Sequence, residues 1–190
     1  MISLNTHPQQ LDTAQALAQV SAQRRAAALR YIRECDCQLS LAAYLLLQEA
    51  LEKDYGITEP PEFAFGPHGK PFLRDYPHIH FNLSHCPGAA LCVVSDAPVG
   101  CDIERVQDVL DPDLCRHCCS PQEQEAILRA SNPPLAFYAL WTRKEAFLKY
   151  TGEGLTDHLP ALLTTPQAAA VHFESRYAPD LSFVYTICRP

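Results

Sequence analysis

The segment WTRKEAFLKYTGEGL, from Trp141 to Leu155, predicts a helix that ends in a glycine-rich turn. Glu145 and Lys149 are four residues apart, so a helix places the carboxylate and the amine on one face. Trp141 precedes Glu145 by four residues, and we expect it on the same face, where it would shield the acid from open solvent. Taken alone, the pattern is also typical of a surface ion pair, which contributes only roughly 0.2–0.5 kcal/mol.

Two more acids lie in the segment VGCDIE, from Val99 to Glu104. The segment predicts a strand, and because side chains alternate along a strand, Asp102 and Glu104 share one face while Ile103 turns to the other. Two neighbouring carboxylates repel each other unless a proton or a cation relieves them. A third acid brought to this pair would make a site for a hard cation such as Mg²⁺. The alternative is a pair of acids at a solvated strand end.

Two turn-forming segments carry further polar residues. Gly66–Pro71 lacks the spacing of a Walker phosphate loop, and Pro71 stands where such a loop has Ser or Thr. Lys70 on this turn can reach a phosphate, or the turn is only a hairpin tip. Ser84 and His85 lie in a predicted loop after a strand, where His85 either binds a phosphate or caps the loop.

Composition and charge exclude several classes of protein. The chain has 190 residues, of which 47% are hydrophobic and 19% charged, and its formal net charge is −7. The acidic balance argues against a protein that acts on nucleic acid or on anionic membranes. The sequence has no run of about 18–20 apolar residues that could span a membrane. Its first residues lack the basic and apolar regions of a signal peptide, so we expect a cytoplasmic protein.

Nine cysteines are many for this length. Because their number is odd and we find no export signal, we expect reduced thiols rather than a disulfide framework. The segment Cys115–Cys119, which includes His117, resembles metal ligation, but Cys35 and Cys37 make a poor second pair for a four-ligand zinc site. Small buried thiols are the preferred interpretation, and a zinc-dependent interaction protein is the alternative.

The order of the predicted elements favours an α+β protein with two halves. Helical and strand patterns occur on both sides of a join near residues 107–112, and we find no sequence repeat. Ser120, with Pro121 and Glu123 after it, predicts a capped helix start. We predict helices over 21–33, 40–55, from 121 to the break at 132–134 and over 135–150, and strands over 62–65, 78–82, 89–95, 98–104, 171–176 and 181–188.

In this order and spacing, the segments resemble the 4′-phosphopantetheinyl transferases, specifically the monomeric class that modifies peptidyl and acyl carrier proteins. The matching blocks are Gly69–Pro71, Phe81–His85, Val99–Glu104 and Trp141–Leu155. The resemblance implies two similar α+β halves in a pseudo-two-fold arrangement, with coenzyme A in the cleft between them. The halves would be residues 1–107 and 108–190. The implied partner is an apo-acyl or peptidyl carrier protein, with no nucleic acid and no membrane.

The resemblance also implies a role for each matching residue. Asp102, Glu104 and Glu145 would hold Mg²⁺ against the pyrophosphate of coenzyme A, and Glu145 would help to remove the proton from the carrier's serine. Lys149 would stabilise charge on the leaving phosphate oxygen. The residues implied to bind the nucleotide are Lys70, Pro71, Ser84, His85 and Lys149, with weaker matches at Arg24 and Ser40.

The implied activity is the Mg²⁺-dependent transfer of 4′-phosphopantetheine from coenzyme A to a carrier serine, with release of adenosine 3′,5′-bisphosphate. Ala27 and Leu39 stand where some relatives have Lys or Arg, so either the nucleotide affinity is lower or Arg25 and Arg30 substitute for them. Carrier proteins of this class are acidic, as is this chain, so docking needs a local basic or apolar patch that the sequence does not place. A catalytically silent carrier-binding or nucleotide-binding module on the same fold is the alternative, and the presence of all three acids and Lys149 argues against it.

Overall fold

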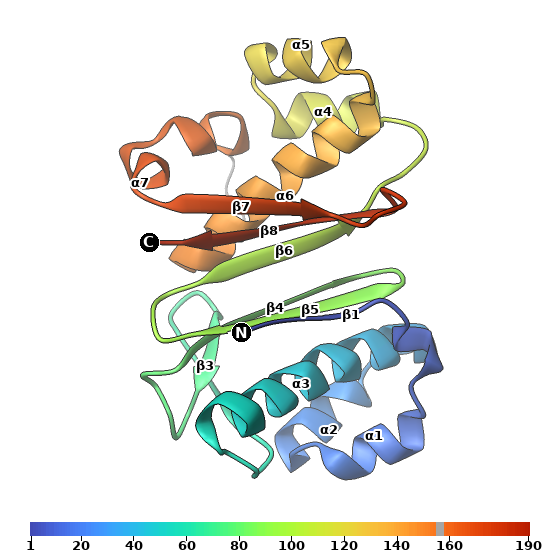
Figure 1. The fold of residues 1–190 in the computed structure, drawn as a ribbon, viewed down its shortest axis with the longest axis vertical. Helices are drawn as coiled ribbons and strands as arrows, with labels where there is room; N and C mark the ends of the chain where they lie inside the picture. Colours follow the sequence, from blue (N-terminus) through green and yellow to red (C-terminus); the bar gives the residue numbers. More distant parts are fainter. Residues whose placement is uncertain (155–157) are drawn as a thin grey trace.

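The computed structural model describes residues 1–154 and 158–190, and Figure 1 shows two sheets next to each other with the long helices on their outer sides. The predicted α+β class is confirmed. Leu155, the last residue of the motif that begins at Trp141, lies outside the described residues. None of the helices in the described part of the chain is long and apolar enough to cross a membrane.

The first half is a three-stranded antiparallel sheet under a long helix. Its strands are ordered β1–β5–β4, and α3 packs on them through a core that includes Leu47, Leu51 and Phe81. The elements of this half are β1 (Ile2–Asn5), η1 (Pro8–Gln10), α1 (Thr13–Gln19), α2 (Ala22–Ala28), α3 (Glu34–Tyr55), β2 (Phe63–Phe65), β3 (Pro71–Leu73), β4 (His80–Cys86) and β5 (Ala89–Ser95).

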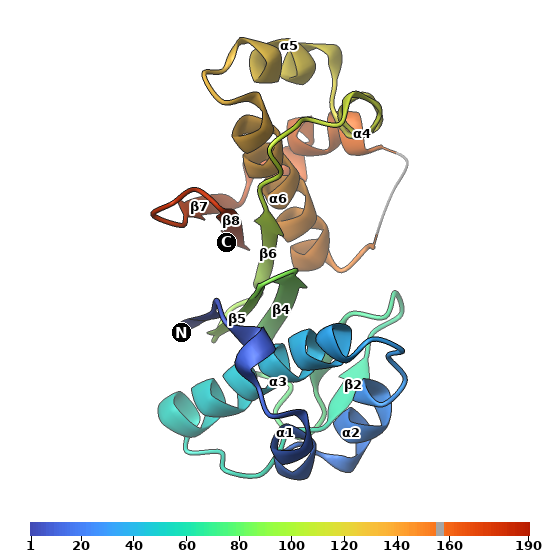
Figure 2. The same cartoon turned by 90° about the vertical axis from the view of Figure 1, so that its right-hand side faces the viewer.

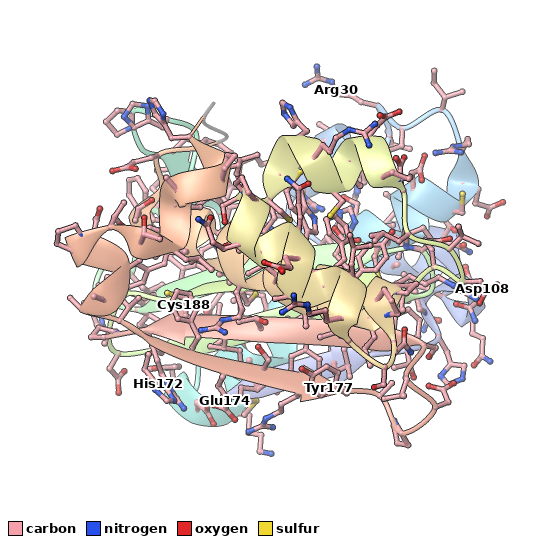
Figure 3. The ribbon with its side chains drawn as sticks, turned by 90° about the horizontal axis from the view of Figure 1, so that it is seen from above. Arg30, Asp108, His172, Glu174, Tyr177 and Cys188 are labelled. Carbon is pink, nitrogen blue, oxygen red and sulfur yellow. The ribbon has the colours of Figure 1, made fainter. Side chains whose placement is uncertain are left out.

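The second half repeats this topology. Its sheet is ordered β6–β8–β7, with β7 at the edge (Figure 3). In each half a strand is followed by a long helix and then by a hairpin, and the first strand pairs with the last. The elements of this half are β6 (Gly100–Arg105), α4 (Pro112–Cys118), α5 (Pro121–Arg129), α6 (Pro133–Thr151), η2 (Leu159–Thr164), α7 (Pro166–Ala169), β7 (His172–Tyr177) and β8 (Phe183–Arg189).

The two similar halves are therefore present although the sequence shows no repeat. What the halves share is the order and pairing of their elements, which different side chains can support. The division of the chain after residue 107 stays a prediction. Because β6 pairs with β8, the strand pairing favours a division before Gly100.

The two sheets are joined along β4 and β6 by side chains that bind backbone groups. Asn82 Oδ1 accepts a hydrogen bond from the N–H of Cys101 at 2.8 Å, and Ser84 Oγ accepts one from the N–H of Ile103 at 3.3 Å. Apolar side chains from β5, β6 and β8 bury the rest of this junction. The junction thus places polar residues of the first half directly beside the strand that carries Asp102.

Gly100 is where β6 and α6 approach most closely. A Cβ atom at this position would lie 2.1 Å from the carbonyl oxygen of Ala146 and 2.4 Å from the backbone nitrogen of Tyr150. Real Cβ atoms do not come so near, so only glycine fits here without a shift of the helix. This close contact fixes the distance between α6 and the acids of β6.

Several predicted elements have different bounds. The helix predicted over 21–33 ends at Ala28, and the residues up to Arg33 form a connection to α3, which begins at Glu34 rather than at residue 40. The predicted loop at Ser84 and His85 is wrong, because β4 continues to Cys86 and His85 pairs with Ala90. These polar residues are held in a strand by the ladder to β5, which local sequence patterns do not show.

Both caps that the sequence indicated are present. Ser120 and Glu123 form a capping box at the start of α5. Gly152 ends α6 in the left-handed conformation (φ 75°), with its N–H bonded to the carbonyl of Leu148 at 2.8 Å. α6 therefore ends at Thr151, after it has placed both Glu145 and Lys149 on the same face.

Candidate active site

Four residues of the two sequence motifs line one cavity of about 530 Å³. β6 contributes Asp102 and Glu104, and α6 contributes Glu145 and Lys149. The alternation predicted for β6 is confirmed, because Ile103 is buried in the apolar core on the opposite face. The structure thus brings the two motifs together from positions more than 35 residues apart in the chain.

Lys149 binds the buried acid of this group. Its Nζ donates to Oδ1 of Asp102 at 2.6 Å and to Oγ of Ser84 at 3.0 Å, and Ser84 Oγ also donates to Asp102 Oδ1 at 2.8 Å. Asp102 is only 3% exposed, and burial raises its pKa against the opposing effect of Lys149. Burial alone would lower the pKa of Lys149, but the attraction of Asp102 outweighs it and raises that pKa above its usual value.

The other two acids are also perturbed. Burial, followed by the charge of Asp102, raises the pKa of Glu104 to about 7. Trp141 Nε1 donates to Glu104 Oε1 at 3.3 Å, so the tryptophan supports this acid as well as shielding the cavity. Burial and the charge of Asp102 likewise raise the pKa of Glu145. The three carboxylates therefore repel one another across a shared space.

The donor chemistry of these acids fits a hard cation. Asp102 Oδ2 is buried and has no hydrogen-bond partner, which leaves one carboxylate oxygen available. Carboxylates in a cavity with room for phosphate and water are the usual environment of Mg²⁺. Within the described residues, no three His, Cys, Asp or Glu side chains already stand close enough together to hold a metal ion. The three acids would have to close around the ion.

The residues implied to bind the nucleotide lie in two groups, and the first is at the rim of the same cavity. Arg24, Ser84 and His85 all line it, together with Pro71. Arg24 donates through Nη2 to the carbonyl (2.6 Å) and the hydroxyl of Ser40, which is fully buried. Ser40 therefore holds Arg24 in place, and its hydroxyl faces the arginine.

His85 is one of the residues that line this cavity. Partial desolvation, and then the positive charges of Lys149 and Arg24, lower the pKa of His85. Arg24 and Lys149 therefore make the side of the cavity near His85 positive. This side suits a phosphate group.

Lys70 lies apart from that group. Its Nζ donates to the carbonyl of Tyr150 at 2.9 Å and to that of Val99 at 3.3 Å, so the amine ties the β2–β3 hairpin to α6. Its predicted contact with the nucleotide stays a prediction. Lys70 does line a second cavity, of about 310 Å³, which shares Pro71, Glu145 and Lys149 with the first.

Some residues of the site were not found from the sequence. Tyr31, Phe63 and Phe65 line the main cavity on the side of the first half. Phe63 and Phe65 occur in a short strand and Tyr31 in a connection, and only the folded arrangement places them at the site.

Lys144, the first lysine of the motif, has a structural role. It is 0% exposed, and its Nζ donates to the carbonyls of Cys118 (2.8 Å) and Leu159 (2.9 Å) and to Glu123 (2.7 Å). These bonds join α6 to α4, α5 and η2. Lys144 thus fixes the helix that presents Glu145 and Lys149.

The cysteines of the zinc alternative lie in an apolar core. Cys115, Cys118 and Cys119 are buried among apolar side chains such as Ile127 and Phe137, where burial raises the pKa of Cys118 and Cys119. A zinc site needs thiolates and four converging ligands. All nine cysteines are free thiols, and all but Cys35 are buried.

Comparison with known proteins identifies the family. A sequence model of the 4′-phosphopantetheinyl transferase superfamily matches residues 98–184. The 4′-phosphopantetheinyl transferase psf-1 of Bacillus pumilus is 32% identical over 174 residues, which cover 88% of this chain and 74% of the relative. The chain belongs to the 4′-phosphopantetheinyl transferase family. The resemblance inferred from the sequence is confirmed.

Two other relatives in this family differ in coverage. A 4′-phosphopantetheinyl transferase of Bacillus subtilis is 34% identical over 145 residues, which cover 74% of this chain and 63% of the relative. The 4′-phosphopantetheinyl transferase AcpT of Salmonella typhi is 31% identical over 135 residues, which cover 69% of this chain and 67% of the relative. The chain thus spans about two thirds of the length of these relatives.

The family match contains the core of the site. Asp102, Glu104, Glu145 and Lys149 all lie within the residues that the transferase superfamily model matches. Arg24, Ser84 and His85 lie before them in the chain. The first half of this chain therefore supplies Arg24, Ser84 and His85, and the matched region supplies the acids and Lys149.

Proposed function

We propose that this protein transfers 4′-phosphopantetheine from coenzyme A to a serine of an apo-acyl or peptidyl carrier protein and releases adenosine 3′,5′-bisphosphate. The observation that carries the proposal is one cavity, lined by Asp102, Glu104, Glu145 and Lys149 together with Arg24 and His85. Such a cavity combines ligands for a hard cation with donors for phosphate. Phosphoryl transfer depends mainly on positioning and on neutralising charge, which these groups supply.

Asp102, Glu104 and Glu145 would hold Mg²⁺, and the bound ion would neutralise charge on the pyrophosphate of coenzyme A. The orphaned Oδ2 of Asp102 supports this assignment. Burial and then the charge of Asp102 raise the pKa of Glu104 to about 7, and a bound cation would offset both effects. Arg24 and His85 would bind the 3′-phosphate at the opposite side of the cavity.

The chain's own residues would move one proton and neutralise one leaving group. The serine oxygen of the carrier forms a bond to the β-phosphorus, and the bond from this phosphorus to the bridging oxygen breaks. Glu145 accepts the serine proton, for which its raised pKa suits it. Lys149, held protonated by Asp102, stabilises the negative charge on the leaving oxygen. The product is a phosphodiester on the carrier.

The second cavity gives the pantetheine arm a place to lie. It continues from Glu145 and Lys149 along Leu83 and Leu148 and passes Gly152. Between the charged groups at its ends, the lining of Leu83, Leu148 and Gly152 suits an uncharged chain. The glycine turn after α6 would thus leave room for the arm, in addition to ending the helix.

One chain supplies both sides of the site. Arg24 and Ser84 come from the first half and Glu145 and Lys149 from the second. A monomer therefore suffices for the proposed reaction.

The rival function is a catalytically silent binding module on the same fold. Incubation with coenzyme A, Mg²⁺ and each of several apo-carrier proteins separates the two functions. The proposal predicts that adenosine 3′,5′-bisphosphate, measured by chromatography, appears in equal amount to the carrier consumed. If coenzyme A and the carrier proteins bind but none of the carriers yields the bisphosphate, the result would support the silent module instead.

A further inference from the structure

The connection between α2 and α3, residues Leu29–Arg33, is the most exposed apolar segment of the described chain. Ile32 is 101% exposed and Leu29 is 64% exposed, and Tyr31 is also exposed. In a folded protein a large apolar side chain that nothing covers costs free energy, and contiguous apolar exposure marks an interaction surface. Three such residues within four positions therefore need an explanation that packing within the chain does not give.

The same connection is locally basic in an acidic protein. Four of the chain's 15 lysines and arginines lie within residues 24–33, and no acid occurs between Asp12 and Glu34. Arg24 and Arg33 are engaged with Ser40 and Asp36. The guanidinium of Arg30 makes no hydrogen bond or ion pair with any described residue, and it projects at the periphery of the molecule (Figure 3). An unpaired cation thus stands two residues from the most exposed isoleucine.

This segment adjoins the active site. Tyr31 lines the main cavity together with Glu145 and Lys149. In Figure 2 the α2–α3 connection lies on the same side of the molecule as the β2–β3 hairpin, whose Phe63 and Phe65 also line that cavity. A surface that covered Ile32 would therefore lie at the mouth of the cavity.

We infer that Leu29–Arg33 is a docking element for the carrier protein, and that it receives a carrier surface on which acidic and apolar side chains flank the acceptor serine. The inference rests on the proposed function, since that reaction requires a protein serine to reach Glu145 and Lys149. Arg30 provides the charge complement and Ile32, with Leu29, the apolar contact. Electrostatic pairing at such a rim steers association, and the apolar contact slows release.

The nucleotide is a poorer occupant of this segment. Arg24 and Lys149 are the cations that line the cavity, with His85 beside them, whereas Arg30 and Ile32 are not part of its wall. A small molecule within the cavity would leave Ile32 uncovered. A protein that covers the cavity mouth would cover it.

The test compares wild type with the variant Arg30→Ala/Ile32→Ser. The matched control is Arg129→Ala/Leu128→Ser, which removes an exposed arginine and an exposed leucine from α5. With a carrier that wild type modifies, we expect the KM for the carrier to rise about tenfold in the loop variant. kcat and the KM for coenzyme A should stay within about twofold of wild type, and the control should match wild type. Because both loop residues are exposed, thermal unfolding should confirm an intact fold.

Salt gives a second readout. Raising the ionic strength from about 0.05 to 0.3 M should raise the wild-type KM for the carrier, and clearly less so in the loop variant. An unchanged KM for the carrier in the loop variant overturns the inference. A rise in the KM for coenzyme A instead assigns the segment to the nucleotide and also overturns it. If wild type modifies no carrier, the wild-type arm alone shows that the proposed function has failed, and the inference falls with it.

Discussion

The amine of Lys149 lies 2.6 Å from Oδ1 of Asp102 and 3.0 Å from Oγ of Ser84. One cation therefore joins α6 to both strands at the junction of the sheets. It neutralises the most buried acid of the cavity while leaving the second carboxylate oxygen of Asp102 without a partner. Lys149 therefore contributes both to the stability of the fold and to the proposed catalysis, and substitutions can separate the two contributions.

Lys149→Met should lower kcat by about 10²–10³, because it removes the charge that stabilises the leaving oxygen. It should also lower the free energy of unfolding by about 3 kcal/mol, because Asp102 is left buried without a counter-charge. The double variant Lys149→Met/Asp102→Asn should recover most of the stability but no transfer. Urea unfolding and steady-state rates measure the two effects. A single variant that keeps kcat within about tenfold of wild type would sink the role of Lys149.

Glu145→Gln should abolish transfer and leave the fold intact. Glu145 makes no hydrogen bond with the described residues, and removing its charge relieves repulsion with Asp102. Binding of Mg²⁺, followed by calorimetry, should weaken in parallel with the rate, and Asp102→Ala should likewise abolish transfer. Glu153→Gln, at an exposed acid outside the cavity, is the matched control and should behave as wild type. Turnover near the wild-type value in Glu145→Gln would show that the metal assignment is wrong.

Gly100→Ala should destabilise the protein by about 3 kcal/mol or more, because the new Cβ atom collides with the backbone of α6. It should also reduce kcat, since α6 carries Glu145 and Lys149 and would be pushed away from Asp102. Gly66→Ala is the control, because a Cβ there meets its nearest atom at an ordinary 3.7 Å. Equal stability of the two variants, measured by thermal unfolding, would contradict the close approach of β6 and α6.

Binding of adenosine 3′,5′-bisphosphate at about pH 6 should take up a proton at His85. The free protein has a lowered His85 pKa, owing to desolvation and to the charges of Lys149 and Arg24. A bound phosphate counteracts those charges and raises the pKa, so affinity should increase as the pH falls towards about 6. Calorimetry in buffers of different ionisation enthalpy measures the uptake. If His85→Gln takes up as many protons as wild type, His85 is not the group that titrates.

The sequence predicted the shared faces of the candidate site residues better than it predicted the bounds of the elements around them. Spacing by two in a strand and by four in a helix predicted that Asp102 shares a face with Glu104 and Glu145 with Lys149, but only the resemblance to the family assigned these residues to one site. Ser84 and His85 were placed in a loop because their partners on β5 are distant in the sequence and cannot be read locally. β1, α1 and β3 were missed for the same reason, since such short segments depend on tertiary contacts.

The docking segment, Leu29–Arg33, also could not be predicted from local sequence patterns. The four arginines of residues 24–33 were visible in the sequence, but a helix over 21–33 would have spread them around its surface. Only the end of α2 at Ala28 exposes Leu29, Tyr31 and Ile32 together. The proposed role of these residues in docking depends on the position of Tyr31 at the cavity, and no local sequence pattern shows that position.

The intact mass of an apo-carrier protein after incubation with this chain, coenzyme A and Mg²⁺ tests the central claim most directly. The account predicts a gain of about 340 Da, one phosphopantetheine group, on the carrier's serine. It also predicts that the gain disappears with Asp102→Ala. An unchanged carrier mass across a panel of apo-acyl and peptidyl carrier proteins would contradict the account.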